Sequence, residues 1–419
     1  MSKLDELIKT LCPDGVEYKT LGELGSFYGG LTGKSKEDFT DGNAKFISYM
    51  NVYSNLALDV NMPDRVKVGD NERQNKVQLG DVLFTGSSEN TEECGMSSVL
   101  TTETQEPLYL NSFCFGYRFN DTSMFLPDFS KFLFRSDSLR KQIIRTASGV
   151  TRFNVSKKKM EKVIIPVPPK EVQSEIVRIL DNFTELTAEL TAELTAELTA
   201  RKKQYEYYRD KYITKTSYNT VKLSEVADIY LGLTYTPTYV ENGVKFISAQ
   251  NTSKDYLDLT NVKYISIEEY EKSTSNAKPK RGDVLFTRVG SNLGHPVIVD
   301  TDEDLCMFVS LGYLRVNKDR LLNRYVRHWM NTDLFWSQVR KNVHGAAKVN
   351  LNTGWLRDFD IILPTMEEQQ HIADILDKFE LLCNDISIGL PAEIEARKKQ
   401  YGYYRDKLLT FKSKNSEVC

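Results

Sequence analysis

The chain has 419 residues, of which 40% are hydrophobic and 27% are charged, so we expect a folded protein of two or three domains and exclude a disordered or collagen-like chain. Its 55 Lys and Arg residues against 58 Asp and Glu residues give a net charge of -3, which excludes a uniformly basic nucleic-acid-binding chain. Six scattered cysteines and the lack of a long apolar run favour free thiols, no structural zinc, no membrane span and a cytoplasmic protein.

The first predicted elements are a short helix and a mixed domain. Leu4, Leu7, Ile8 and Leu11 share one face of a helix. Residues 13 to 169 then contain short strand-like runs, such as KFIS and GDVLFT, separated by Gly, Asn and Pro. We therefore predict a compact N-terminal domain over residues 1–169 that contains both helices and strands.

Candidate DNA-contacting residues of this domain lie in three segments. Residues 134 to 170 hold ten Lys or Arg residues against two acidic ones, although such a cluster often forms only a solvated face. The loop 148–154 offers a cation to a phosphate, while Gly149 and Asn154 alone also fit a simple turn. The segments after GDVLFT and after the GLT turn supply the rest. The predicted DNA-binding residues here are Lys34, Lys36, Ser87, Asn90, Arg145, Arg152, Lys157 and Lys158.

A long helix is predicted over residues 170–214, because apolar residues recur at helical spacing after Pro168 and Pro169. At about 1.5 Å per residue it is roughly 67 Å long. The tetrapeptide TAEL occurs three times in succession from Thr187 to Leu198, so its leucines drift by about 40° per repeat around the helix. A low-complexity linker is the alternative interpretation of this run.

Residues 215–364 repeat the first domain. VKLSEVADIYLGLT at 221–234 matches KTLGELGSFYGGLT at 19–32, and GDVLFT returns at 282–287. The loops after the shared strands differ, with Arg288 suited to guanine and Asn292 to adenine, which predicts an asymmetric DNA target. The predicted DNA-binding residues here are Thr236, Arg288, Ser291, Asn292, Arg340, Lys341 and Lys348.

A second long helix is predicted over residues 365–411, followed by a tail, 412–419, because RKKQYEYYRDK at 201–211 returns as RKKQYGYYRDK at 397–407. We expect the two helices to lie antiparallel, with a kink near residue 390 where Gly389 and Pro391 interrupt the second one. The residues assigned to interhelical packing or to the docking of a partner subunit are Ile176, Leu180, Phe183, Tyr205, Tyr208, Ile372, Leu376, Phe379, Tyr401 and Tyr404.

The duplication predicts an α+β fold in which two similar domains are related by pseudo-twofold symmetry and joined by two long antiparallel helices. No catalytic or metal site is predicted. The sequence contains no GxxxxGK[ST] phosphate loop and no amino-methyltransferase motif, and its four histidines lack HExxH spacing. The nearest match to a nuclease motif, Asp14 with Glu17 and Lys19, places its acids only three residues apart.

Duplicated halves, TAEL repeats in the central helix, and the paired signatures EVQSEIVRILDNF and EEQQHIADILDKF resemble the specificity subunits of type I restriction-modification enzymes. The resemblance covers nearly the whole chain. It implies two target-recognition domains that each read half of a bipartite double-stranded DNA site, and helices that set the spacer and dock two methyltransferase subunits. It also implies restriction and translocase subunits as further partners, with S-adenosylmethionine, ATP and Mg bound by partners and no cofactor in this chain.

Two other classes of function are alternatives to the recognition of a DNA site. A helical scaffold that assembles partner proteins without DNA recognition fits the slightly acidic composition but not the paired basic stretches. An autonomous nuclease or methyltransferase lacks the motifs that it needs.

Overall fold

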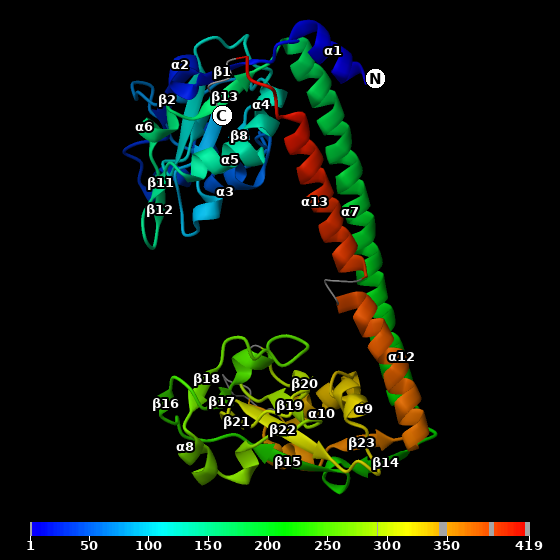
Figure 1. The fold of residues 1–419 in the computed structure, drawn as a ribbon. Coiled ribbons are helices and arrows are strands. Elements are labelled where there is room, and N and C mark those ends of the chain that lie inside the picture. The colour runs from blue at the N-terminus through cyan, green and yellow to red at the C-terminus, as the bar shows by residue number, and fades with distance from the viewer. Residues whose placement is uncertain (1, 291, 343–349, 385–388, 415–419) are drawn as a thin grey trace. The chain divides into compact units, whose positions relative to one another are not determined.

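The computed structural model describes residues 2–290, 292–342, 350–384 and 389–414. It contains two compact units (Figure 1). Unit 1 combines Met1–Ala192 with Glu395–Cys419, and unit 2 is Glu193–Ile394. Each unit therefore takes part of the long central helix and part of the C-terminal helical region, whereas the sequence had suggested boundaries at residues 169, 214, 364 and 411. No helix of the described residues is long and apolar enough to cross a membrane.

The elements of unit 1 that precede the central helix alternate short helices and strands. In chain order they are α1 (Lys3–Leu11), β1 (Glu17–Thr20), α2 (Leu21–Leu24), β2 (Gly25–Gly29), η1 (Lys36–Phe39), β3 (Ala44–Ile47), α3 (Tyr49–Ser54), β4 (Arg65–Val66), β5 (Lys76–Val77), β6 (Val82–Thr85), β7 (Ser87–Ser88), η2 (Thr91–Glu93), β8 (Ser97–Val99), β9 (Leu108–Leu110), β10 (Cys114–Phe119), α4 (Pro127–Leu133), α5 (Asp137–Ile144), β11 (Ala147–Ser148), β12 (Phe153–Val155), α6 (Lys157–Met160) and β13 (Ile164–Val167).

The central helix α7 (Lys170–Ile213) leads into the elements of unit 2. These are β14 (Asn219–Lys222), η3 (Leu223–Glu225), β15 (Ala227–Leu231), β16 (Tyr239–Val240), β17 (Val244–Ile247), η4 (Ala249–Thr252), β18 (Lys263–Ile265), α8 (Ile267–Lys272), η5 (Ser275–Ala277), β19 (Val284–Thr287), β20 (Pro296–Ile298), β21 (Leu305–Met307), β22 (Leu311–Val316), α9 (Asn323–Trp329), α10 (Asp333–Asn342), α11 (Thr353–Arg357), β23 (Asp360–Leu363) and α12 (Met366–Asn384), followed by α13 (Leu390–Leu408).

The sheets confirm the duplication. The antiparallel order β2-β10-β6-β8 in unit 1 becomes β15-β22-β19-β20 in unit 2, and β1-β13 becomes β14-β23. In a second sheet of each unit, the KFIS strand runs parallel to a later strand, β9 or β21. The GDVLFT strands β6 and β19 bury all four of their residues at the centre of their sheets. Two copies of one α+β fold therefore account for the sequence repeat.

The repeated aspartate of GDVLFT is a buried anchor in both units. Arg118 Nη2 lies 2.6 Å from Asp81, and Arg315 Nη2 lies 2.6 Å from Asp283. Both aspartates are nearly inaccessible to solvent. Since an unpaired buried carboxylate is costly, each arginine compensates the charge that its sheet buries.

The start of α7 is fixed by a buried amide. Gln173 donates to the carbonyls of Met124 and Pro168 and accepts from the amide of Leu126. Val172, Ile176 and Leu180 enter the core of unit 1 one helical turn apart. Gln369 makes the matching three hydrogen bonds at the start of α12, so both helices are seated on their domains in the same way.

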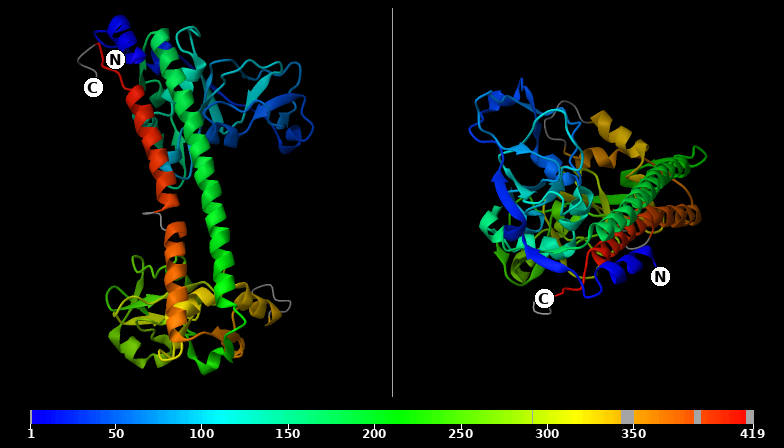
Figure 2. Two further views of the ribbon diagram at one scale, coloured as in Figure 1. Left: turned by 90° about the vertical axis from the view of Figure 1, so that its right-hand side faces the viewer. Right: turned by 90° about the horizontal axis from the view of Figure 1, so that it is seen from above.

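The predicted helix over 170–214 agrees with α7, which is continuous (Figure 2). Its leucines change exposure as a four-residue period requires, because Leu186 is 61% exposed, Leu190 is half-buried and Leu194 is 9% exposed. The helix predicted over residues 365–411, with a kink near residue 390, is described as two helices, α12 and α13. Gly389, just before α13, has a φ of +92° that a helix does not contain, which agrees with an interruption at this place.

Antiparallel helix packing is confirmed inside each unit. In unit 1, Phe183 of α7 stacks on Tyr404 of α13 and Thr184 lies beside Tyr401, so the partners run in opposite directions. In unit 2, Tyr208 of α7 stacks on Phe379 of α12 with ring centroids 6.2 Å apart. Each unit thus presents a pair of helices next to its α+β domain.

Candidate nucleic-acid interface

Four segments of unit 1 meet around one open pocket of about 470 Å³. They are the helix α3, the segment after β6, the loop between β9 and β10, and the hairpin β11–β12, which Figure 1 shows projecting from the domain. Two of these four, the segment after β6 and the hairpin, were predicted from the sequence as DNA-contacting loops. The pocket-lining residues are Tyr49, Met50, Tyr53, Ser87, Ser88, Glu89, Glu93, Phe113 and Arg152.

Arg152 is the exposed cation of this pocket. Its Nε lies 3.3 Å from the hydroxyl of Ser87, and its guanidinium lies 6.0 Å from the centroid of the exposed Phe113 ring. The hairpin is tied to the scaffold because Asn154 pairs with Ser87 in the β-ladder. Gly149 turns the hairpin with a φ of +151°, where a Cβ would lie 2.0 Å from a carbonyl oxygen. A positioned but solvent-facing arginine suits contact with phosphate.

Other cations predicted in unit 1 are exposed beside this hairpin. Lys157 and Lys158 begin α6, which directly follows β12, and Arg145 ends α5 just before β11. Lys157 lies 5.5 Å from the centroid of the Phe115 ring. Lys36 is exposed at the start of η1. These residues keep their ammonium and guanidinium groups available to an anionic ligand.

Two predicted contact residues of unit 1 have structural roles instead. Lys34 is largely buried and pairs with Glu72 at 2.5 Å, and its ammonium lowers the pKa of Glu72 to about 2. Ser87 is 8% exposed and accepts from Arg152. Asn90 remains exposed, although its side-chain oxygen already caps η2. Of these, only Asn90 retains a place on the accessible surface.

The basic stretch of residues 134 to 170 is also less available than its composition suggested. Arg140 is 9% exposed and donates to the carbonyls of Glu92, Cys94 and Gly95. Arg135 donates to four main-chain carbonyls, and burial lowers its pKa to about 10. Both arginines hold loops in place and do not face a ligand.

In unit 2 the predicted guanine reader Arg288 is buried against the main chain. It is 9% exposed, and its guanidinium donates to the carbonyls of Val309 and Leu351. Burial lowers the pKa of Arg288. The half-buried Asn292 donates to the carbonyl of Thr252 at 3.4 Å. Sequence spacing identified the right loop, but the arginine serves to fix it.

The other predicted DNA-contacting residues of unit 2 differ in their exposure and in their partners. Thr236 is exposed and lines a pocket of about 250 Å³ together with Gln250 and Lys263. Arg340 is exposed but pairs with Asp333 at 2.7 Å, and Lys341 is exposed on α10. Ser291 and Lys348 lie outside the described residues.

Comparison with known proteins agrees with this arrangement. The family model for the type I restriction modification DNA specificity domain matches the chain twice, over residues 13–200 and 215–396. The chain belongs to this family of specificity subunits.

Named relatives and solved structures are consistent with that assignment. The chain is 36% identical to S.HindORF215P of Haemophilus influenzae, over 63% of this chain and 68% of that protein. It is 34% identical to the EcoR124I/EcoR124II specificity subunit of Escherichia coli, over 61% of this chain and 65% of that protein.

The fold matches a chain from a structural study of complex assembly in the type I R-M system, with a TM-score of 0.72 and 17% identity over 94% of this chain and 97% of that one. It also matches the HsdS subunit of Thermoanaerobacter tengcongensis, with a TM-score of 0.52 and 17% identity over 95% of this chain and 96% of that one.

The helical residues of this specificity subunit divide into two groups. Ile176, Leu180, Ile372 and Leu376 are buried in the cores of their own units, and the four tyrosines and two phenylalanines named from the sequence contact a neighbouring helix or domain. These residues are therefore interhelical. The exposed residues at repeat-related positions are different ones: Leu186 and Leu382, and Tyr207 and Tyr403. The two residues of each pair are 196 positions apart, which is the offset between the halves. Comparing the two helices at this offset would have identified these positions from the sequence.

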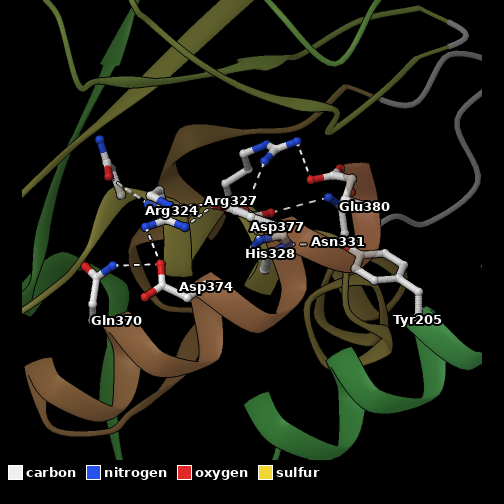
Figure 3. A network of polar contacts seen from close by, with 10 residues as sticks. Tyr205, Arg324, Arg327, His328, Asn331, Gln370, Asp374, Asp377 and Glu380 are labelled. Atoms are coloured by element: carbon white, nitrogen blue, oxygen red, sulfur yellow. Dashed lines mark hydrogen bonds and ion pairs between the residues drawn. The ribbon is translucent and has the colours of Figure 1, made fainter. Parts of the chain in front are cut away.

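Unit 2 of the specificity subunit contains a polar network where α7, α9 and α12 meet (Figure 3). His328, fully buried, lies 3.0 Å from the hydroxyl of Tyr205 and 2.6 Å from Asp377. Arg324 pairs with Asp377, and Arg327 pairs with Glu380 at 2.7 Å. His328, Asp377 and Glu380 are close enough together to surround an ion, but both ring nitrogens and both carboxylates already have partners. We interpret the cluster as an ion-pair network that fixes the helices.

Proposed function

We propose that this specificity subunit recognises an asymmetric, bipartite double-stranded DNA site, with one half read by each unit, and directs methylation and restriction by its partner subunits. The observation that carries the proposal is one scaffold present twice with unlike surfaces at its loops. The pocket of unit 1 carries Met50, Phe113 and Arg152, and that of unit 2 carries Thr236, Gln250 and Lys263. Two domains that share one scaffold but carry different residues at their loops are expected to recognise different base sequences in the two half-sites.

The chain itself supplies binding and no chemistry in this proposal. S-adenosylmethionine belongs to the modification subunits, and ATP and Mg to the restriction and translocase subunits. We place the complex in the cytoplasm, where it has access to chromosomal DNA. The alternative of a helical scaffold without DNA recognition is favoured by no observation.

Two modification subunits would bind, one at the helix pair of each unit. Leu186 and Tyr403 in unit 1 correspond to Leu382 and Tyr207, respectively, in unit 2, and each of the four residues is between 58% and 63% exposed. Large exposed apolar residues at duplicated positions suit two copies of one partner. The four side chains are apolar or aromatic, which distinguishes them from the basic side chains of the hairpin that we assign to DNA.

The proposal is tested by reconstituting the subunit with its modification subunit and mapping methylated bases in host DNA. An asymmetric two-part motif that depends on this chain is the expected result. Arg152→Ala is expected to weaken DNA binding by the complex about equally at all sequences and to reduce the salt dependence by about one ion. Lys272→Ala, which changes an exposed lysine on α8 paired with Glu268, is the matched control. A motif that forms without this chain would contradict the proposal.

A further inference from the structure

Both units place a short helical turn directly after the KFIS strand, α3 in unit 1 and η4 in unit 2. One buried asparagine fixes each turn. Asn51 Nδ2 donates to the carbonyl of Asp59 at 2.9 Å, and Asn251 Nδ2 donates to the carbonyl of Asp258 at 3.0 Å. The two asparagines are 8% and 6% exposed. The main chain of the turn is therefore held at the same place in both copies of the fold.

Each turn is bonded to the loop that follows the GDVLFT strand. In unit 1 the Tyr49 hydroxyl donates to the carbonyl of Ser87 at 2.9 Å. In unit 2 the hydroxyls of Thr252 and Thr287 lie 3.2 Å apart, and Asn292 donates to the carbonyl of Thr252. The turn and the loop thus form one platform in each unit.

The residue that precedes the buried asparagine differs between the two platforms. Met50 is 59% exposed and lines the pocket of unit 1 together with the equally exposed Phe113. Gln250 is exposed and lines the pocket of unit 2. The same fixed backbone position therefore carries methionine in unit 1 and glutamine in unit 2, and each side chain lines a pocket built from different neighbours.

We propose that Met50 and Gln250 are base-reading residues, one for each half-site; this inference rests on the proposed function. Both side chains are uncharged, so contact with phosphate gives neither of them a strong interaction. In the major groove, the side-chain oxygen of a glutamine accepts from the N6 amino group of adenine while its side-chain nitrogen donates to N7, so glutamine pairs with adenine through both groups at once. Met50 and Phe113 offer apolar surface that suits the methyl group of thymine. We therefore assign an adenine to the half-site of unit 2 and a thymine to that of unit 1.

The test uses the full subunit with its modification subunit and maps the methylated motif for Gln250→Ala and Met50→Gln. Gln250→Ala is expected to make one adenine position of one half-site degenerate, with a preference reduced by roughly 5- to 150-fold, and to leave the other half-site unchanged. Met50→Gln is expected to alter a thymine position in the opposite half-site. Gln370→Ala, an exposed glutamine on α12, is the matched control and should leave the motif unchanged.

The outcomes separate this inference from the function on which it rests. An unchanged motif for Gln250→Ala and Met50→Gln, or a uniform loss of methylation without any change of preferred bases, would overturn the base-reading assignment alone. Changes by both variants in the same half-site would also overturn it. If the unaltered chain directs no two-part motif, the proposed function itself fails. Folding of the Gln250 variant is checked through tryptophan fluorescence, because Trp329, Trp336 and Trp355 all lie in unit 2.

Discussion

At the scale of single residues, repeat-related positions show how one site can be filled in two ways. Asp377 in unit 2 pairs with buried His328 and with Arg324, whereas its counterpart Asp181 in unit 1 pairs with Lys131 at 3.0 Å. The position of His328 is occupied in unit 1 by Phe132, which is also fully buried. The helix junction therefore keeps an ion pair in both units, but its buried ring is a hydrogen-bonded imidazole in unit 2 and an apolar phenyl group in unit 1.

Asp377→Asn is expected to lower the free energy of unfolding of unit 2 by about 1.5–3 kcal/mol at neutral pH, because it weakens hydrogen bonds to a charged group. Burial alone would raise the pKa of Asp377, but His328 and Arg324 lower it below its ordinary value. The stabilisation is therefore present above a pH of about 4 and is lost as the pH falls through the folded-state pKa. Denaturation followed by tryptophan fluorescence between pH 3 and 7 measures both effects.

Asp181→Asn is the matched control, since Asp181 is half exposed and surface pairs contribute about 0–1 kcal/mol. Its effect is followed by circular dichroism, because unit 1 contains no tryptophan. Equal destabilisation by the two variants, or an unaltered acid limb for Asp377→Asn, would contradict the role assigned to the network.

Residue charge in the sequence did not separate scaffold from interface. Arg152 and Arg288 were both predicted to contact DNA, yet the first is exposed and the second donates to buried carbonyls. The guanidinium of an arginine can bind either a DNA phosphate or main-chain carbonyls of its own protein. Which of these it binds depends on whether the fold leaves nearby carbonyls without hydrogen-bond partners. Met50 and Gln250 were missed for the opposite reason, because neither carries a charge. Comparing KFISYMN with KFISAQN would have shown them as unlike residues before a shared asparagine.

At the scale of elements, periodicity predicted the helices well because their apolar faces are long. The start of α7 after Pro168–Pro169 agrees with the structure, and the short helix predicted from Leu4, Leu7, Ile8 and Leu11 corresponds to α1. The break between α12 and α13 was foreseen only as a kink, since Gly389 and Pro391 indicate an interruption but not its extent. The second sheet of each unit depends on a parallel pairing between strands about 60 residues apart, which local patterns do not reveal.

The buried glutamines that begin α7 and α12 are expected to be anchors of equal importance for their own units. Gln369→Ala removes the partners of two carbonyls and one amide, and each such group costs about 1–3 kcal/mol when it stays dry, so we expect a loss of about 3 kcal/mol in unit 2. Tryptophan fluorescence should report a lower midpoint in denaturant. Gln173→Ala should instead lower the circular-dichroism transition of unit 1 and leave the tryptophan signal unchanged, because the three tryptophans lie in unit 2. A shift of the tryptophan midpoint by Gln173→Ala would contradict this separation.

At the scale of the whole molecule, the two units are connected in sequence by one uninterrupted helix. The change from unit 1 to unit 2 falls between Ala192 and Glu193, inside the TAEL repeats. A repeat of four residues is close to one helical turn, so units of this length can be added or removed while the helix and its ends persist. The tetrapeptide run is thus placed where a change of length affects the connection and neither domain.

Deleting one repeat, residues 191–194, should shorten α7 by about 6 Å and rotate its ends by about 40° relative to one another. On B-DNA, at roughly 3.4 Å and 34° per base pair, this corresponds to a spacer shorter by one to two base pairs. The bases of both half-sites should stay the same, because no pocket residue is altered. Methylome mapping of the variant complex measures spacer and bases together.

The control is a deletion of two residues, 192–193, which shortens the helix by only about 3 Å but rotates its ends by about 200°. Because the two readers would then face different sides of the duplex, this smaller deletion should abolish methylation although the larger one preserves it. A spacer that is unchanged after removal of a full repeat would contradict the assignment of α7 as the ruler. So would a change in the bases themselves, because the helix length would then act through the domains and not between them.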